Sequence, residues 1–355
     1  MNLPRIHIGR PQRLAALLLL AFIAECLWSL ARLPPTHAAL AAPHSDGVFA
    51  DLVVTLPLAL LHLVHCDGSR AALVLLRLPF VFFAVWMGGG LWWVSRRLFG
   101  NEGGFIALAL YCFCPTVVRL AITPNDDLLA MWGLYGVVYT AIGVAHAMQG
   151  PRRKWRPRIL LLTLALGLTA AAHLLAAIVG LIAALCFMLY LAERRRSTAL
   201  QILSIATIGA FAILFTLEGF HPSALRAALP GPISLSLASL RSFVSERSNL
   251  PILVATGVAA ILYIALRRSR YFGNTAPLLM ILTLAPFVYL QPVVAQQGVG
   301  VASIAGAPWI WALPFFFTLL GGVFADALET RARKLFFALT AAILAAQAIL
   351  CLAAV

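Results

Sequence analysis

Acidic residues are rare in this sequence, and two of them stand side by side in an unusual place. Only 11% of the 355 residues are charged, yet Asp126 and Asp127 lie together in VRLAITPNDDLLAMWG (118–133), between two long apolar runs. Carboxylates so placed can accept a proton from an attacking hydroxyl group or orient a substrate. They also suit a helix start after Pro124, where the helix dipole favours acids by about 0.3–1 kcal/mol. One acid would suffice for capping, so the pair favours a functional role for at least one of them.

The elements that must position these carboxylates are long apolar helices. Apolar residues make up 62% of the chain, and its mean hydropathy is +0.96. Repeated apolar stretches of roughly 18 to 22 residues match the length that a helix needs to cross about 30 Å of hydrocarbon. The composition therefore predicts an all-α, polytopic helical membrane protein.

The positive charge of the chain is a signal of membrane topology. A net charge of +14 would also suit a nucleic-acid-binding protein, but most of the 26 lysine and arginine residues form short clusters between apolar runs. Basic loops of this kind stay on the cytoplasmic side, which predicts a cytoplasmic N-terminus, an external C-terminus and no nucleic-acid partner. The clusters are Arg5/Arg10/Arg13, Arg96/Arg97, Arg152/Arg153/Lys154/Arg156/Arg158, Arg194/Arg195/Arg196, Arg267/Arg268/Arg270 and Arg331/Arg333/Lys334.

The alternation of basic loops and apolar runs predicts about eleven transmembrane helices. The run at 52–64 is too short to cross and is predicted to lie at the outer interface, after a short first outer loop at 34–52. The basic start and the small residues of HAALAAP also resemble a cleavable signal peptide, but the first apolar run reaches spanning length. The expected spans are 14–33, 71–95, 103–120, 127–148, two within 158–192, 199–217, 251–267, 275–292, 307–325 and 336–354.

This topology places most acidic residues on the outer side of the membrane. Asp126 and Asp127 would stand at the outer mouth of two spans, on the same side as Asp46 and Asp51. The six cysteines lie mostly inside apolar runs, and Cys112 and Cys114 point to different faces of one helix, so no metal or disulfide framework is indicated.

The order of several short motifs in 77–141 resembles the polytopic glycosyltransferases of the GT-C fold. This group (glycosyltransferase family 39-like) includes protein mannosyltransferases and aminoarabinose lipid A transferases. In it, an Arg-Leu-Pro begins the second span, a basic turn ends that span, glycines open the third, a proline lies near its outer end, and an aspartate opens the fourth. The matching positions are Arg77-Leu78-Pro79, Arg96 to Gly100, Gly103-Gly104, Pro115, and Asp126 or Asp127.

The resemblance covers about the first 200 residues well and the rest loosely. It implies a GT-C-like core at 1–200 and C-terminal transmembrane helices at 201–355, where a groove between late spans would suit a polyprenyl chain. The implied protein lies in the cytoplasmic (inner) membrane among membrane lipids. It would transfer a sugar from a polyprenyl-phosphate donor to a lipid, glycan or protein acceptor on the outer face.

The resemblance also implies roles for individual residues. Asp46 is the first choice for the general base, and Asp51 is the second. Asp126 and Asp127 would orient the acceptor or the catalytic loop. Arg119 would pair with the donor phosphate or with one of these aspartates, because the departing lipid phosphate is an anion.

Two histidines, His44 and His173, are weaker candidates for contacts near the site. No cofactor is required, although a divalent cation held by Asp126 and Asp127 is compatible with the chemistry. His173 occupies a place where the family commonly has lysine, within GLTAAAHLL (167–175).

The first outer loop departs from the family pattern and keeps an alternative open. Asp46 is followed by Gly47, whereas family members usually have a longer loop with a second acid after the aspartate. The alternative is a non-catalytic or transporter-like membrane protein that handles lipid-linked envelope precursors. A carrier would show ionisable groups at the bilayer midplane, where Glu25 is one candidate.

Overall fold

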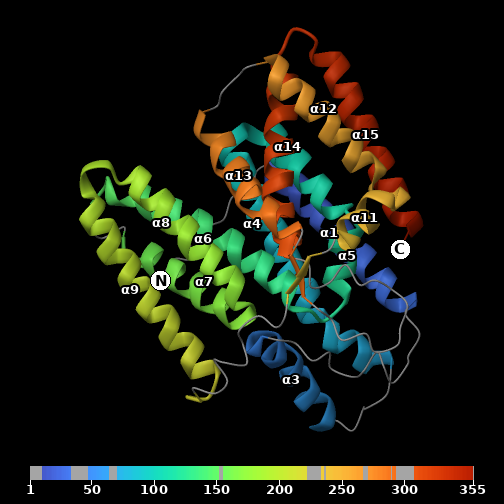
Figure 1. The fold of residues 1–355 in the computed structure, drawn as a ribbon. Coiled ribbons are helices and arrows are strands. Elements are labelled where there is room, and N and C mark those ends of the chain that lie inside the picture. The colour runs from blue at the N-terminus through green and yellow to red at the C-terminus, as the bar shows by residue number, and fades with distance from the viewer. Residues whose placement is uncertain are drawn as a thin grey trace.

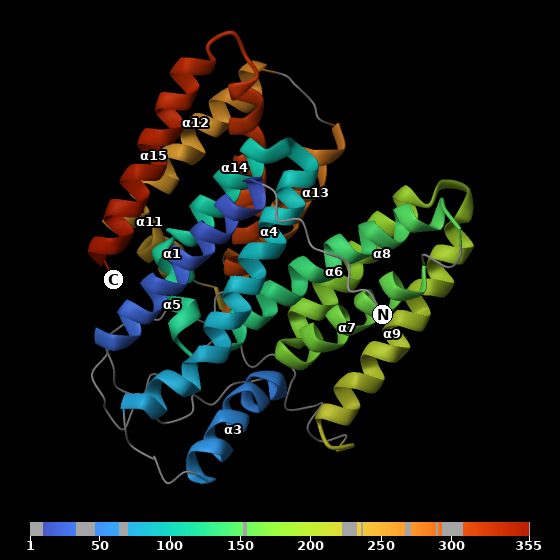
Figure 2. The same ribbon diagram turned by 180° about the vertical axis from the view of Figure 1, so that it is seen from behind.

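A computed structural model shows a bundle of helices with one small pair of strands (Figure 1 and Figure 2). It describes residues 10–32, 47–63, 70–151, 155–221, 233–235, 237–266, 271–288, 290–292 and 308–354. The longer helices are α1 (Arg10–Arg32), α3 (Val48–Leu63), α4 (Arg70–Cys112), α6 (Asp126–Met148), α7 (Arg156–Ala172), α8 (Leu174–Leu191), α9 (Arg196–Leu217), α12 (Leu250–Leu266), α13 (Tyr271–Leu284), α14 (Leu313–Leu328) and α15 (Arg333–Ala354). The all-α polytopic class is confirmed.

Helix α4 contains a chain reversal that joins two of the expected spans. Gly100 has φ 82° and ψ −173°, a backbone conformation that glycine adopts easily because it lacks a Cβ. A Cβ on Gly104 would lie 2.9 Å from the Arg96 Cβ, so the two arms of α4 return alongside one another. Arg96 Nε donates to Asn101 Oδ1 at 2.8 Å and closes the turn.

Among the described helices, α4 and α14 have the most extensive contact, and glycines allow them to approach closely. A Cβ on Gly321 would lie 2.6 Å from the Gly103 carbonyl oxygen, and one on Gly322 would lie 2.5 Å from the Phe99 ring. Between helices in lipid, van der Waals contact is the main attraction, so small residues that allow close approach stabilise the pair. Helix α1 packs on the same α4, with Phe22 and Tyr111 fully buried between them.

Helices α6, α7, α8 and α9 form a second group beside the α4–α14 pair (Figure 1). Their apolar side chains form a core of their own, which includes Val137, Leu162 and Ala206. Small residues again set the spacing, since a Cβ on Gly133 would lie 2.2 Å from Thr169 Oγ1. Helix α6 belongs to both groups because Leu128, Leu134 and its neighbours pack into the larger core.

Several shorter elements lie between α9 and α14 in the sequence. They are α11 (Ala238–Ser245), the 3-10 turn Arg247–Asn249, and the 3-10 turn Pro308–Ala312 that leads into α14. Strands β1 (Ile233–Leu235) and β2 (Leu290–Pro292) pair antiparallel, with Ser234 opposite Gln291.

Eight helices among the described residues are long and apolar enough to cross a membrane. Large apolar side chains on their outer faces remain exposed, for example Ile208 at 70% and Leu335 at 67%, as expected for surfaces in contact with lipid. The protein is therefore an integral membrane protein. The count of eleven stays a prediction, because α4 contains two expected spans and α7 and α13 have only 17 and 14 residues.

Two expected spans differ in detail from the structure. The span expected at 103–120 is interrupted at Phe113–Cys114, and the chain resumes as α5 (Pro115–Ile122), because Pro115 cannot donate a hydrogen bond within a continuous helix. The span expected at 275–292 ends earlier, since α13 passes into a 3-10 turn at Ala285–Val288 and then into β2.

The outer juxtamembrane segment predicted at 52–64 is helical and begins earlier than expected, at Val48. Most of the first outer loop, 34–52, lies outside the described residues. The same is true of residues 152–154 in the basic loop that precedes α7. The proposed division at residue 200 stays a prediction, and α9 crosses it while packing on α7.

The α4–α14 contact generates a stability prediction. Replacing Gly321 with Ala places a methyl group against the Gly103 carbonyl oxygen, which belongs to the backbone and cannot rotate away. We expect a loss of about 1–3 kcal/mol, as in other overpacked cores, seen as a lower melting temperature of the detergent-solubilised protein. Gly257→Ala in α12 is the control, because nothing lies within 4 Å of its added Cβ. Equal melting temperatures for the two variants would contradict this account of the contact.

Candidate functional site

The start of α6 is capped by Asn125, and the aspartates that follow are not needed for capping. Asn125 Oδ1 accepts from the Leu128 backbone N–H at 2.8 Å, which is the usual N-cap bond. Its amide group also donates to the carbonyl oxygens of Leu120 at 2.9 Å and Thr123 at 2.6 Å. The alternative in which an aspartate serves as the N-cap is therefore wrong: Asn125 is the cap, and it holds the end of α5 and the start of α6 together.

Asp127 is buried and bonded to a residue from the distant end of the chain. Its side chain is only 4% exposed, and Oδ1 accepts from Trp311 Nε1 at 3.2 Å. Trp311 belongs to the 3-10 turn before α14 and is itself fully buried, as Trp309 nearly is. The two tryptophans thus lie inside the bundle, although their position near a span end is more typical of an interfacial belt. Asp126 lies in the same first turn and is partly exposed.

His173 meets the same tryptophan. It forms the break between α7 and α8, with extended φ −158° and ψ 112°, and its ring centroid lies 4.7 Å from that of Trp311 in a T-shaped arrangement. Trp311 therefore connects Asp127 and His173, which come from different helices. We call these three residues the Trp311 cluster.

Helix α3 begins against the turn that carries His173. A Cβ on Gly47 would lie 2.0 Å from the Ala172 carbonyl oxygen, so no side chain fits at this position. Gly47 directly follows Asp46 in the sequence, and Asp46 and His44 lie outside the described residues. Asp51 lies one turn further along α3, and its side chain is exposed.

Arg119 lies in a second polar cluster. It forms an ion pair with Glu246, which in turn accepts from Ser248 Oγ at 2.7 Å and from Asn249 Nδ2 at 3.4 Å. Gln347 in α15 joins this cluster to the end of α4 by donating to the carbonyl oxygens of Ser248 at 3.3 Å and Phe113 at 2.6 Å. The carboxylate that Arg119 contacts is thus Glu246, whereas its expected partner was the donor phosphate or one of Asp126 and Asp127.

The two clusters use partners that sequence reasoning missed. Trp311 and Glu246 lie 184 and 127 residues from Asp127 and Arg119, respectively. A signal for Glu246 was present in the polar run Glu246-Arg247-Ser248-Asn249 before an apolar helix. Trp311 carried no comparable signal, because a tryptophan near a span end is common.

The described residues contain no group of three or more His, Cys, Asp or Glu side chains arranged to hold a metal ion. Asp126 and Asp127 are adjacent on one helix, so their Cβ atoms diverge by about 100° around the axis. A cation bound by both would need further oxygen ligands from outside this turn or from water.

Comparison with known proteins identifies one related fold. ArnT from Cupriavidus metallidurans, in its apo-state crystal structure, aligns with a TM-score of 0.51 and 13% sequence identity over 90% of this chain. The alignment spans 61% of the ArnT chain, so this protein corresponds to less than two thirds of its length. The protein has an ArnT-like polytopic membrane fold. No protein-family model matches the sequence, and no curated protein matches it significantly.

Substitutions at the start of α6 should show that Asn125 stabilises this helix end more than Asp126 does. Asn125→Ala removes three side-chain hydrogen bonds, and we expect a loss of about 1–2 kcal/mol in the free energy of unfolding. Asp126→Ala removes a favourable helix-dipole interaction of about 0.3–1 kcal/mol. Thermal unfolding of both variants in the same detergent measures the difference. A larger loss for Asp126→Ala would show that the cap is assigned wrongly.

The bond between Asp127 and Trp311 gives a second prediction. In a double-mutant cycle of Asp127→Ala and Trp311→Phe, we expect a coupling energy of about 0.5–3 kcal/mol, because the two side chains are in direct contact within the bundle. The cycle cancels the cost of the smaller phenylalanine ring, which affects both backgrounds alike. Additive losses would show that the bond contributes nothing to stability.

Proposed function

We propose that the protein transfers a sugar from a polyprenyl-phosphate donor to a cell-envelope acceptor on the outer face of the cytoplasmic membrane. The observation that carries the proposal is the Trp311 cluster, a buried carboxylate and a histidine held together at one end of an ArnT-like fold. A carboxylate held by Trp311 inside a membrane protein is costly to bury, and such groups usually serve a function.

We assign the roles of the aspartates from the solvent exposure of their side chains. Asp127 is nearly inaccessible and keeps its role as a positioning group, which orients the acceptor or the loop around it. The proton acceptor needs access to the attacking hydroxyl group. Asp46 remains the first choice for this base and Asp51, which is exposed on α3, the second.

Arg119 supplies a cation for the departing lipid phosphate in this proposal. Its side chain is 42% exposed although it is paired with Glu246. A guanidinium has five N–H donors, and one carboxylate leaves some of them available. Glu246 and Ser248 would then position Arg119, while its free donors face the anion. A divalent cation near Asp126 and Asp127 is compatible with this arrangement, but the proposed reaction does not require one.

The second candidate is a non-catalytic or transporter-like protein that handles lipid-linked envelope precursors. The observation that favours it is the first outer loop, in which Gly47 follows Asp46 and is packed against Ala172. A second acid at position 47 would collide with this turn. The acidic pair expected of an active loop is therefore excluded at this position by packing.

The test is transfer of radiolabelled sugar from a panel of polyprenyl-phosphate donors by purified protein in lipid. We expect turnover by the wild type, a loss of about 10²–10⁴-fold for Asp46→Asn if it is the base, and roughly 10²-fold for Asp127→Asn through misplaced substrate. Glu218→Gln, at a partly exposed acid that ends α9, is the matched control and should keep full activity.

The two candidate functions give different outcomes in this assay. Loss of turnover in a variant that keeps its melting temperature supports the enzyme. No turnover with any donor, together with donor binding that Asp46→Asn and Asp127→Asn both retain, rejects the enzyme in favour of the non-catalytic protein.

A further inference from the structure

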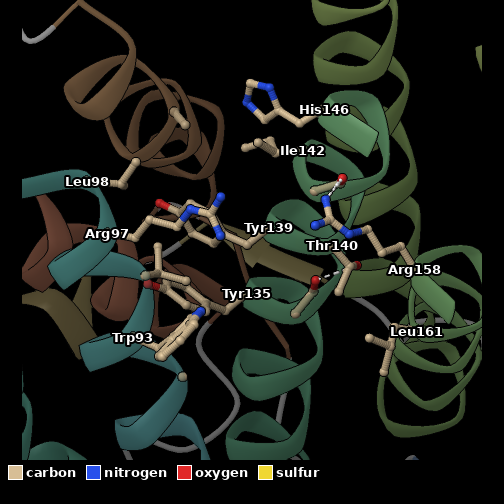
Figure 3. Close-up of a pocket in the computed structure, with 15 residues that line it drawn as sticks. Trp93, Arg97, Leu98, Tyr135, Tyr139, Thr140, Ile142, His146, Arg158 and Leu161 are labelled. Carbon is tan, nitrogen blue, oxygen red and sulfur yellow. Dashed lines mark hydrogen bonds between the residues drawn. The ribbon is translucent and has the colours of Figure 1, made fainter. Parts of the chain in front are cut away.

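A pocket of about 700 Å³ extends along α6 away from the Trp311 cluster. Residues of α4, α6 and α7 line it, together with Ala276 of α13 (Figure 3). His146 at its far end lies about five turns, or roughly 28 Å, along α6 from Asp127 at 1.5 Å per residue. This distance is close to the thickness of the bilayer core, so the His146 end of the pocket and the Trp311 cluster belong to opposite halves of the membrane.

Two arginines and a histidine from three separate helices line the pocket. Arg97 comes from α4, His146 from α6 and Arg158 from α7, and the close-up shows the two arginines on opposite sides with His146 above them (Figure 3). None of the residues that line the pocket within the described chain is an aspartate or glutamate. Two permanent positive charges with no acid between them attract an anion, and more strongly beside low-dielectric walls.

The arginines keep donors that an anion can use. Arg158 Nη1 donates to the Gly143 carbonyl oxygen at 2.5 Å, which orients the side chain and uses one of its five N–H groups. Among the described residues, Arg97 is in neither of the ion pairs found, Arg119–Glu246 and Arg333–Glu102. The buried Tyr139 hydroxyl also has no hydrogen-bond partner in the described part of the chain.

The rest of the pocket is apolar and opens toward lipid. Trp93 of α4 and Leu161 of α7 line its two sides and are 58% and 55% exposed. In a membrane protein these exposed apolar side chains contact acyl chains. A soluble anion gains nothing from such walls, whereas a lipid buries its chains against them.

We propose that this pocket binds the phosphate headgroup of an anionic phospholipid from the leaflet at the Arg97 end of the helices. Arg97 and Arg158 neutralise the phosphate, and the acyl chains leave between Trp93 and Leu161. Such a lipid bridges the α4–α14 pair and the α6–α9 group, because the two arginines stand on different sides of this boundary. Basic pockets between helices are known to suit anionic lipids.

The experiment is native mass spectrometry of the full-length, detergent-solubilised protein with three probes. They are a phosphatidylglycerol, a phosphatidylcholine with the same acyl chains, and inorganic phosphate. We expect phosphatidylglycerol to bind about tenfold more tightly than phosphatidylcholine, as one unopposed charge-assisted contact would give. We expect inorganic phosphate to bind far more weakly, because it gains nothing from the apolar walls.

Two variants and two matched controls test the location. Arg97→Gln removes a pocket charge, and Gly90→Leu fills the pocket without changing charge, since nothing lies within 4 Å of a Cβ at Gly90. Each should weaken phosphatidylglycerol binding about tenfold or more. Gly89→Leu has equally open surroundings but lies outside the pocket lining, and Arg194→Gln removes an exposed charge elsewhere. Both controls should bind like the wild type.

Three results would overturn the proposal. The first is equal binding of phosphatidylglycerol and phosphatidylcholine. The second is an equal loss in the variants and their controls, which would indicate a general charge effect. The third is inorganic phosphate binding as tightly as the lipid, which would leave an anion site without a lipid.

Discussion

The close approach of α4 and α14 is the constraint on which the other contacts of this protein depend. A membrane offers little hydrophobic drive for one helix to leave lipid for another, so tight packing of small residues must supply the attraction. Gly103 and Gly321 provide it by bringing two backbones together. As a result, 83% of the most apolar part of Pro308–Leu328, which contains α14, is buried inside the protein. Only 17% of the corresponding part of the neighbouring α15 is buried. Helix α14 is thus the centre of the bundle although it lies near the end of the sequence.

The position of α14 determines two polar connections across the bundle. Thr318 donates to the Pro314 carbonyl oxygen at 2.8 Å, so its oxygen accepts from Tyr135 at 3.1 Å and from Ser95 at 3.4 Å. About two turns earlier in the chain, Trp311 donates to Asp127. Since Tyr135 and Asp127 both lie on α6, a small shift of α14 along its axis would disturb both bonds together. The packing of glycines is therefore coupled to the geometry of the candidate site.

Helix α6 links the two polar regions that the structure separates. Its first turn carries Asp127 against Trp311, and its last turns line the pocket with Arg97 and Arg158. Negative charge gathers at one end of the helix and positive charge at the other, which matches the helix dipole at both ends. The same asymmetry agrees with the topology that the basic clusters indicate. One end suits chemistry on a hydroxyl group, and the other suits an anionic headgroup.

The sequence alone determined the class of the protein, the approximate positions of most helices and the start of α6. These properties are local: apolar length predicts a span, and two acids after Pro124 predict a helix start. It also indicated that Asp127 and His173 belong to one side of the membrane. The chain reversal at Gly100 lies in the basic turn that the sequence places between two spans. The break at Pro115 lies in an apolar run, where proline is also common inside spans.

Only the tertiary structure decided which residues meet. Trp311 with Asp127, Glu246 with Arg119, and Arg97 with Arg158 are all brought together by helix packing. In a water-soluble helix, polar residues mark the outer face and apolar ones the core. Here the lipid-facing and buried faces are both apolar, as exposed Ile208 and buried Leu134 illustrate, so periodicity cannot show which face turns inward. The partners of each helix, and with them the site and the pocket, therefore follow from the fit of small and large side chains in three dimensions.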